Sequence, residues 1–327
     1  MPRKIEISHR TIIFAFLLVG AIWFLLRILE IIVILLISII LMSALNPTID
    51  RLQKMKFPRW LAIGLIYFLV ITIFSVSVGK IIPLLVEQTS NLIAQLPNIV
   101  RNIRFANLDA SILTSQISEF SQIPGNILKF TAGIFTNLIS IFTIGVLTFY
   151  LLMERINLKQ YLVAMFGDGG EKRAAVLIDK IESSLGGWVR GELVLMTTVG
   201  FMCYLGLVLL AVPYALPLAI VAGMLEVVPT IGPIISAVPA IATAAAISPY
   251  ISLAVAALYF IVQQLENGLL VPKIMQRVTG VNPLVALLSL MIGFNIGGPL
   301  GGLLAIPVIL VLKVIIFEYL ASRKTNS

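Results

Sequence analysis

The chain has 327 residues, of which 59% are hydrophobic and only 12% are charged, and its mean hydropathy is +1.07. A soluble domain carries about twice that charged fraction. The composition therefore excludes an ordinary soluble protein and predicts an all-α, polytopic integral membrane protein. The net charge of +8 does not indicate nucleic-acid binding, because Lys and Arg concentrate in short segments between apolar runs. That pattern orients proteins in the cytoplasmic (inner or plasma) membrane.

The apolar runs indicate about eight transmembrane helices within a single membrane domain, residues 1–327. In chain order the runs are Ile12–Leu29, Ile31–Leu45, Leu61–Ile82, Phe130–Met153, Leu193–Val212, Ile251–Leu265, Pro283–Ile296 and Leu300–Leu320. We expect a very short turn between the first two, marked by Arg27 and Glu30.

Basic residues cluster in both terminal tails, in the Arg51–Arg59 loop, in the segment after Met153 and around Lys273. Placing both termini in the cytoplasm puts all of these clusters on one side. The predicted spans then alternate consistently between the two sides of the membrane if Pro213–Ser248 enters and leaves from the outer side, as a re-entrant hairpin of two short helices. If this stretch instead made two full crossings, every other segment would stay on the same side of the membrane, so both topologies stay open.

Two polar segments interrupt the membrane part. Residues 83–129 form an expected outer helical insert, and residues 154–191 an expected cytoplasmic segment with an amphipathic helix. In Glu171–Arg190, apolar residues recur at helical spacing. Such a stripe usually packs on its own chain, and an oligomer contact is the alternative. The C-terminal region 193–320 carries the distinctive motifs.

The broken stretch Pro213–Ser248 contains a carboxylate, Glu226, followed by Pro229, Gly232 and Pro233. A charged group in a membrane segment is normally kept only where it faces protein or a water-filled cavity. Broken backbone at membrane depth is tolerated in the same places. These residues therefore predict a transport site in which Glu226 binds a cation or takes and releases a proton. The alternative is a carboxylate at the interface that caps the next half-helix.

A second polar group, Gln263, Glu266 and Asn267, ends a predicted span. It is a further candidate for the substrate or cation site, and an ordinary interfacial helix end explains it equally well. Gly293, Gly297 and Gly301 recur every four residues, which is the spacing of small residues in tightly packed helices.

Gly298 and Pro299 make a local break plausible, and Pro307 follows in the same run. Together with Gly297 and Gly301 they are candidate hinge or packing residues. The pair of Gly-Pro interruptions, at Gly232-Pro233 and Gly298-Pro299, is a pattern that points to transporter binding sites.

Several enzyme classes are excluded by what the chain lacks. His9 is the single histidine and Cys203 the single cysteine, so no His or Cys metal site and no Ser-His or Cys-His pair can form within one chain. A phosphate-binding G-x-x-x-x-G-K-[ST] loop is also absent, so no ATPase is built in. We expect neither an enzyme nor a bound cofactor or metal.

Three stretches together resemble the autoinducer-2 exporter family of membrane permeases. They are Glu226-Val-Val-Pro-Thr-Ile-Gly-Pro233, Gln264-Leu-Glu-Asn267 with Val271-Pro-Lys273, and Gly301-Gly-Leu-Leu-Ala-Ile-Pro307. Members of that family have been assigned to export of the signalling molecule autoinducer-2, and others to sodium/proton antiport. The resemblance implies a transporter, and it also implies a homo-oligomer, with a pentamer as the form it suggests.

The leading hypothesis is a permease or exporter for a small polar solute, such as autoinducer-2, that is not driven by ATP. A monovalent cation/proton antiporter is the alternative within transport. A membrane scaffold that transports nothing is the alternative of another class. In each case the lipid bilayer is the surrounding partner.

Overall fold

The computed structural model describes residues 9–76, 137–228, 231–245, 247–275 and 280–325, with a few single positions between 79 and 133. All regular structure in this described part is helical, which confirms the all-α prediction. Nearly all of the predicted outer insert, residues 83–129, lies outside the described residues, as do Pro229 and Thr230.

Helix α1 runs without interruption from His9 to Lys54, a length of 46 residues. The predicted turn at Arg27 and Glu30 is therefore wrong, because neither Gly nor Pro stops the helix there. A continuous helix that crosses the bilayer puts its ends on opposite sides. The N-terminus and the Arg51–Arg59 loop can share the cytoplasmic side only if the chain turns back between them. Because α1 does not turn back, the side of the N-terminal tail stays a prediction.

Helices α2 (Arg59–Val76) and α6 (Leu138–Glu154) pack beside the C-terminal half of α1 around a small apolar core. Arg59 of α2 holds these three helices together through hydrogen bonds to α6 and α1. Its Nε donates to the carbonyl oxygen of Leu152 at 2.7 Å, and its guanidinium also donates to Asp50 at 3.0 Å. Two further acceptors, the side-chain oxygens of Gln53 and Asn46, lie at 2.7 Å each. A guanidinium with a fork of donors suits such a set.

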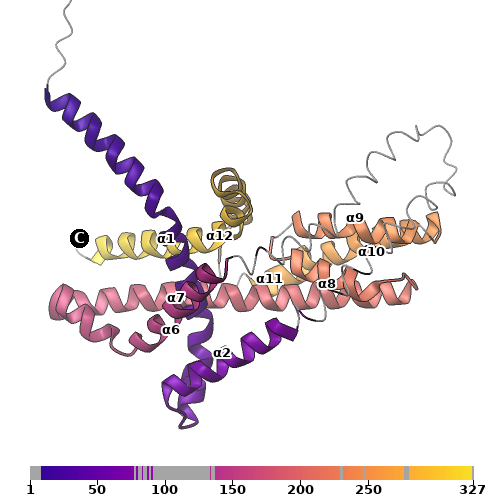
Figure 1. The fold of residues 1–327 in the computed structure, drawn as a ribbon, viewed down its shortest axis with the longest axis horizontal. Coiled ribbons are helices and arrows are strands. Elements are labelled where there is room, and N and C mark those ends of the chain that lie inside the picture. Colours follow the sequence, from indigo (N-terminus) through magenta and orange to yellow (C-terminus); the bar gives the residue numbers. More distant parts are fainter. Residues whose placement is uncertain are drawn as a thin grey trace, which may run out of the picture.

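The long helix α7 (Leu158–Leu209, 52 residues) is the axis on which the other elements assemble (Figure 1). Its backbone breaks helical geometry at Gly167, where φ is 69°. The predicted cytoplasmic segment and the next predicted span are parts of this one helix. Leu185 and Trp188, from the amphipathic stripe, are buried against α1 and α12 of the same chain. The prediction that the stripe packs on its own chain is confirmed.

The crossing of α1 over α7 follows from two residues. Pro47, inside α1, has no N–H to donate to the carbonyl of Ser43 one turn earlier. Gly186 of α7 lies against that carbonyl, because a Cβ at this position would be only 2.1 Å from the Ser43 oxygen. Only glycine allows this approach.

Beyond α7 the chain forms the two short helices predicted for Pro213–Ser248. Helix α8 (Ala215–Leu225) runs back along α7, and α9 (Ile231–Ala245) packs against α8 and α10 (Pro249–Leu265). The π-helix η2 (Glu266–Leu270) and the short α11 (Val271–Ile274) complete this part. The core between these elements is apolar and includes Leu207, Ala240 and Val255.

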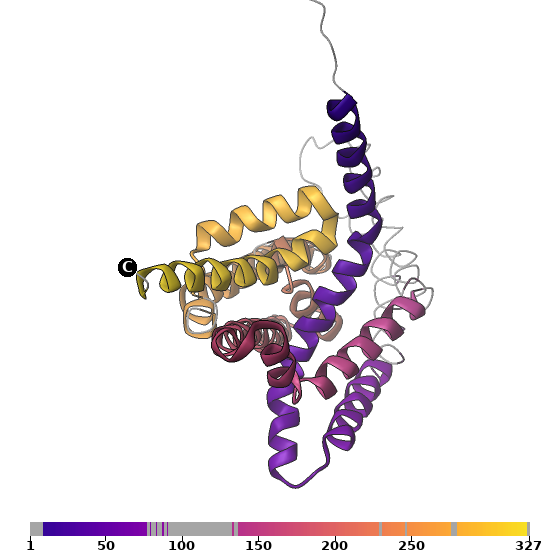
Figure 2. The same cartoon turned by 90° about the vertical axis from the view of Figure 1, so that its left-hand side faces the viewer.

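Helix α12 (Pro283–Thr325) folds back on itself (Figure 2). Its helical geometry fails at Gly297 (φ −125°, ψ 15°) and Gly298 (φ 58°, ψ −145°), which confirms the predicted break. The two halves are held close at Gly293, where a Cβ would be 2.4 Å from the carbonyl oxygen of Gly301. The predicted tight packing holds at Gly293 and Gly301 but not at Gly297, where a Cβ would meet nothing within 4 Å.

Four helical stretches of the described residues are long and apolar enough to cross a membrane: Ile28–Lys54, Glu171–Leu209, Pro249–Ile274 and Leu284–Glu318. Shorter apolar helices are Arg59–Ile73, Leu138–Glu154, Ala215–Leu225 and Gly232–Ala245. Leu284–Glu318 qualifies by length and composition, but the break at Gly297 and Gly298 divides it into two halves that fold back on each other. The chain is thus a multi-pass membrane protein built from full-length and shorter helices.

Candidate functional site

Glu226 lies where α8 ends and the chain turns toward α9. It is the residue after the last helical position of α8, and its side chain is only 1% exposed. One carboxylate oxygen, Oε2, has no hydrogen-bond partner. A carboxylate that caps a helix at an interface would face water, so burial favours the predicted site over the capping alternative.

The turn after Glu226 is held by close backbone contact. The N–H of Gly232 donates to the carbonyl oxygen of Val228 at 2.9 Å. A Cβ at Gly232 would lie 1.8 Å from the carbonyl oxygen of Leu225, so only glycine fits between the end of α8 and the start of α9. Pro233 is buried, and its carbonyl oxygen accepts a hydrogen bond from Ser236 Oγ at 2.9 Å.

Glu266 begins the π-helix that follows α10, and it is 2% exposed. Single turns of π-helix are uncommon and are frequent at functional sites. Gln263, one turn earlier, donates from Nε2 to Glu266 Oε2 at 2.9 Å. Asn267, the third member of the predicted polar group, is exposed and points away from this arrangement.

The structure brings together two predicted groups that the sequence left separate. The carboxyl groups of Glu226 and Glu266 lie within hydrogen-bonding reach of each other. Two carboxyl groups form such a hydrogen bond only when one of them carries a proton, because an ionised carboxylate is only an acceptor. Glu226, Glu266 and Gln263 therefore form one buried polar site between α8, α10 and η2.

Glu192, on α7, is a third buried carboxylate that the sequence reading did not single out. It is 4% exposed, neither of its carboxylate oxygens has a hydrogen-bond partner, and it interacts electrostatically with Glu266 and Glu226. The signal that points to it is its position in the apolar part of a helix, directly after Gly191. It was missed because the polar segment and the next span were read as separate elements that meet there.

No basic side chain of the described residues forms an ion pair with these three carboxylates. The ion pairs within the described part join Arg59 to Asp50, Arg155 to Asp179 and Glu182, and Lys180 to Glu318. An acidic side chain placed in a membrane costs about 3 kcal/mol on insertion scales even when it is alone. Three together without counter-charge require positive charge from elsewhere, from protons or from a bound cation.

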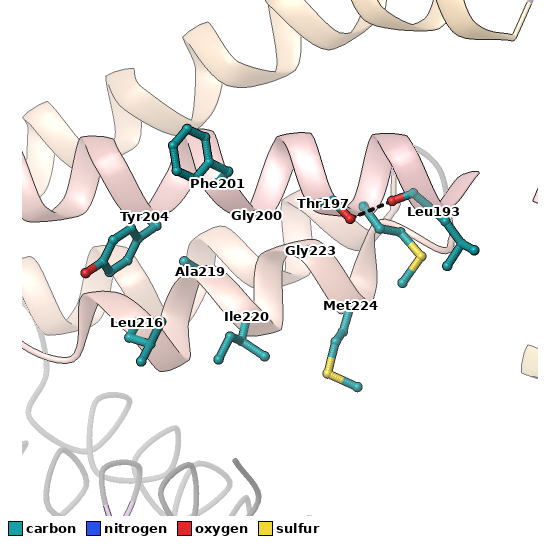
Figure 3. Close-up of a pocket in the computed structure, with 11 residues that line it drawn as sticks. Leu193, Thr197, Gly200, Phe201, Tyr204, Leu216, Ala219, Ile220, Gly223 and Met224 are labelled. Carbon is teal, nitrogen blue, oxygen red and sulfur yellow. Dashed lines mark hydrogen bonds between the residues drawn. The ribbon is translucent and has the colours of Figure 1, made fainter. Parts of the chain in front are cut away.

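A groove between α7 and α8 is a different feature. It holds about 420 Å³ between α7 and α8 and is lined mainly by apolar side chains, among them Phe201, Leu216 and Met224 (Figure 3). None of the three carboxylates lines it. The helices nearly touch at its floor, since a Cβ at Gly223 would be 2.7 Å from the carbonyl oxygen of Met196. An exposed apolar groove between membrane helices is suited to lipid or protein contact rather than to a polar solute.

The candidate hinge residues do not join the carboxylates. Gly297 and Pro299 lie exposed at the bend of α12, and Pro307 is buried in its second half. That half packs on the Leu185–Trp188 part of α7 and on α1. Their place in the structure indicates helix packing and a bend, at a distance from the polar site.

Comparison with known proteins identifies the family of this chain. The model of the AI-2E family transporter matches residues 12–321, nearly the whole chain. The chain belongs to the AI-2E transporter family. Two Bacillus subtilis proteins whose names suggest a role in transport are similar to this AI-2E chain. YueF is 29% identical over 300 residues, covering 85% of this chain and 81% of its own, and YrrI is 28% identical, covering 95% and 93%.

A third relative is the AI-2 transport protein TqsA of Escherichia coli. It is 23% identical over 297 residues, which cover 87% of this chain and 85% of TqsA. The family and these relatives indicate a membrane transporter, and their names are those of transporters rather than enzymes. The resemblance stated from the sequence motifs is confirmed.

Proposed function

We propose that this AI-2E protein exports a small polar solute, such as autoinducer-2, across the cytoplasmic membrane without using ATP. The carrying observation is the buried Glu226–Glu266 pair at the junction of two short helices and a π-helix. The name of the relative TqsA, an AI-2 transport protein, supports autoinducer-2 as the solute to test first. The absence of a phosphate-binding loop from the sequence supports a gradient-driven or passive mechanism.

In this proposal the polar site is built from Glu226, Glu266 and Gln263. The free Oε1 of Gln263 and the free Oε2 of Glu226 are acceptors available to hydroxyl groups of a solute. Gly232 and Pro233 hold the backbone that presents Glu226, and Pro229, a predicted member of the site, lies outside the described residues. Asn267, exposed one residue after Glu266, is assigned to the approach to the site.

A second candidate function is exchange of a monovalent cation for protons. The observation that favours it is the burial of acidic side chains without a basic partner among the described residues. Such a group binds positive charge, whereas a site for a neutral solute does not require three carboxylates.

The test uses the purified full chain in proteoliposomes, with autoinducer-2 uptake and a pH-sensitive dye read in parallel. Glu226→Gln keeps the shape of the side chain and removes its charge, and we expect it to abolish transport with normal expression and assembly. Glu226→Asp should retain part of the rate. Antiport moves protons when sodium is added, and simple solute export does not, so the dye separates the two candidate functions.

Glu154→Gln is the matched control, because it removes one exposed carboxylate at the end of α6. Its transport should equal that of the wild type. Wild-type rates in Glu226→Gln from about pH 6 to about pH 9 would refute the proposed site. A wild-type chain that moves neither autoinducer-2 nor cations would favour the scaffold.

The basic-residue bias supports a cytoplasmic location for the Arg51–Arg59 loop, for the first part of α7 and for the C-terminal tail. The short α8 and α9 support the re-entrant hairpin, because eleven residues are too few to cross a hydrocarbon core of about 30 Å. We also propose a homo-oligomer, for which the exposed apolar side chains of Phe16 and Phe24 on α1 offer a contact surface.

A further inference from the structure

Glu192 differs from the other two carboxylates in its surroundings. Glu226 and Glu266 have each other, and Glu266 also accepts from Gln263, but neither oxygen of Glu192 has a hydrogen-bond partner. Its side chain is 96% buried on the α7 face that meets α8 and η2. An unpartnered carboxylate this deeply buried is unfavourable unless something binds it.

We propose that Glu192 binds a small monovalent cation, either a proton or an alkali ion, and so couples positive charge to transport at the Glu226–Glu266 site. This inference rests on the proposed function and adds to it a third residue and a ligand class. Glu192 interacts electrostatically with both other carboxylates, so positive charge on Glu192 changes the charge that the pair experiences.

The charged and titratable groups around Glu192 agree with this assignment. On the facing elements these are Glu226 after α8 and Glu266 in η2, both of them acidic. On α7 itself Arg190 donates to the carbonyl oxygen of Ala44, and on α11 Lys273 is exposed. The sequence neighbours of α11 at 276–279 lie outside the described residues.

The geometry argues against a resident divalent metal. No group of three His, Cys, Asp or Glu side chains in the described residues converges closely enough to hold a metal ion. A divalent ion needs several oxygen ligands around one point, whereas a proton needs one carboxylate. An alkali ion can complete its shell with backbone carbonyls and water, so it too needs only one carboxylate.

The experiment has two arms, each on the full-length chain. The first measures binding of radioactive sodium to the purified protein in lipid nanodiscs. The second measures proton movement with a pH dye in proteoliposomes during autoinducer-2 transport. An alkali ion gives a signal in the first arm, and a proton gives one in the second arm alone. In the arm that responds, we expect Glu192→Gln to reduce the signal by roughly tenfold or more, while Glu154→Gln leaves it unchanged.

If Glu192→Gln fails to assemble, Glu192→Asp replaces it, since a shorter carboxylate should weaken the same signal with an unchanged unfolding temperature. Wild-type signals in both arms for the assembled Glu192 variant, with transport still lost in Glu226→Gln, would overturn the inference and leave the proposed function standing. If the wild type gave no signal in either arm while Glu226-dependent solute transport was intact, the inference would also be overturned. Full transport in Glu226→Gln and Glu192→Gln alike would refute both.

Discussion

Adding a single methyl group at Gly232 tests whether the contact between α8 and α9 controls the site. In Gly232→Ala the new Cβ would lie 1.8 Å from the carbonyl oxygen of Leu225 and 3.0 Å from the backbone N of Glu226. Because ordinary contact begins near 3.4 Å, the two helices must separate by roughly 1.5 Å. Backbone atoms cannot rotate away, so we expect an overpacking cost of about 3 kcal/mol. The better helix propensity of alanine offsets about 1 kcal/mol of this.

The net loss of about 2 kcal/mol should lower the thermal unfolding temperature, measured by intrinsic fluorescence of the purified protein. Transport should fall even well below that temperature, because the shift moves Glu226 away from Glu266. Gly64→Ala, in α2, is the matched control: its Cβ meets nothing within 4 Å, so only propensity acts and stability should rise by up to about 1 kcal/mol. If both variants changed stability in the same direction, and Gly232→Ala transported like the wild type, the reasoning about this junction would be refuted.

Two further predictions concern the frame around the site. Arg59→Lys replaces the guanidinium that donates to the carbonyl of Leu152 and to three side chains of α1, and one ammonium cannot reach all four acceptors; we expect a loss of about 2 kcal/mol by thermal unfolding. An unchanged unfolding temperature would show that this network is dispensable. Gly293→Ala places a Cβ 2.4 Å from the carbonyl oxygen of Gly301, so it should destabilise by about 1–3 kcal/mol, in contrast to a neutral or stabilising Gly64→Ala.

Hydrophobic run length predicted which parts of the chain are helical but not where the helices end. At Arg27 and Glu30 a turn was expected from charge alone, and α1 continues through both residues. A pair of charges does not remove a backbone hydrogen bond, whereas Pro and Gly change backbone conformation directly. The break at Gly297 and Gly298 was predicted correctly for that reason. Continuity of α7 through Gly191 was missed because a polar segment was equated with a separate element.

The candidate site was predictable residue by residue but not as a group. Glu226 stood out because an acidic residue in an apolar stretch is costly, and Gly232 because glycine precedes proline there. The pairing of Glu226 with Glu266 is a contact between segments 40 residues apart, and no periodicity reports such contacts. Asn267 seemed equivalent to Glu266 in the sequence, yet the π-helix turns one side chain inward and its neighbour outward.

The three carboxylates are carried by different kinds of backbone, and this bears on how the site can work. Glu192 belongs to the uninterrupted part of α7, which is the axis of the molecule. Glu226 follows the end of α8, and Glu266 begins a π-helix, so both depend on irregular backbone. Regular helices move as rigid units, whereas element ends absorb changes of φ and ψ. A shift at the α8–α9 junction therefore changes the distance from Glu226 to Glu192 while α7 stays fixed. Less repulsion between these carboxylates weakens the need for bound positive charge, so in the proposed mechanism opening the site also releases the cation.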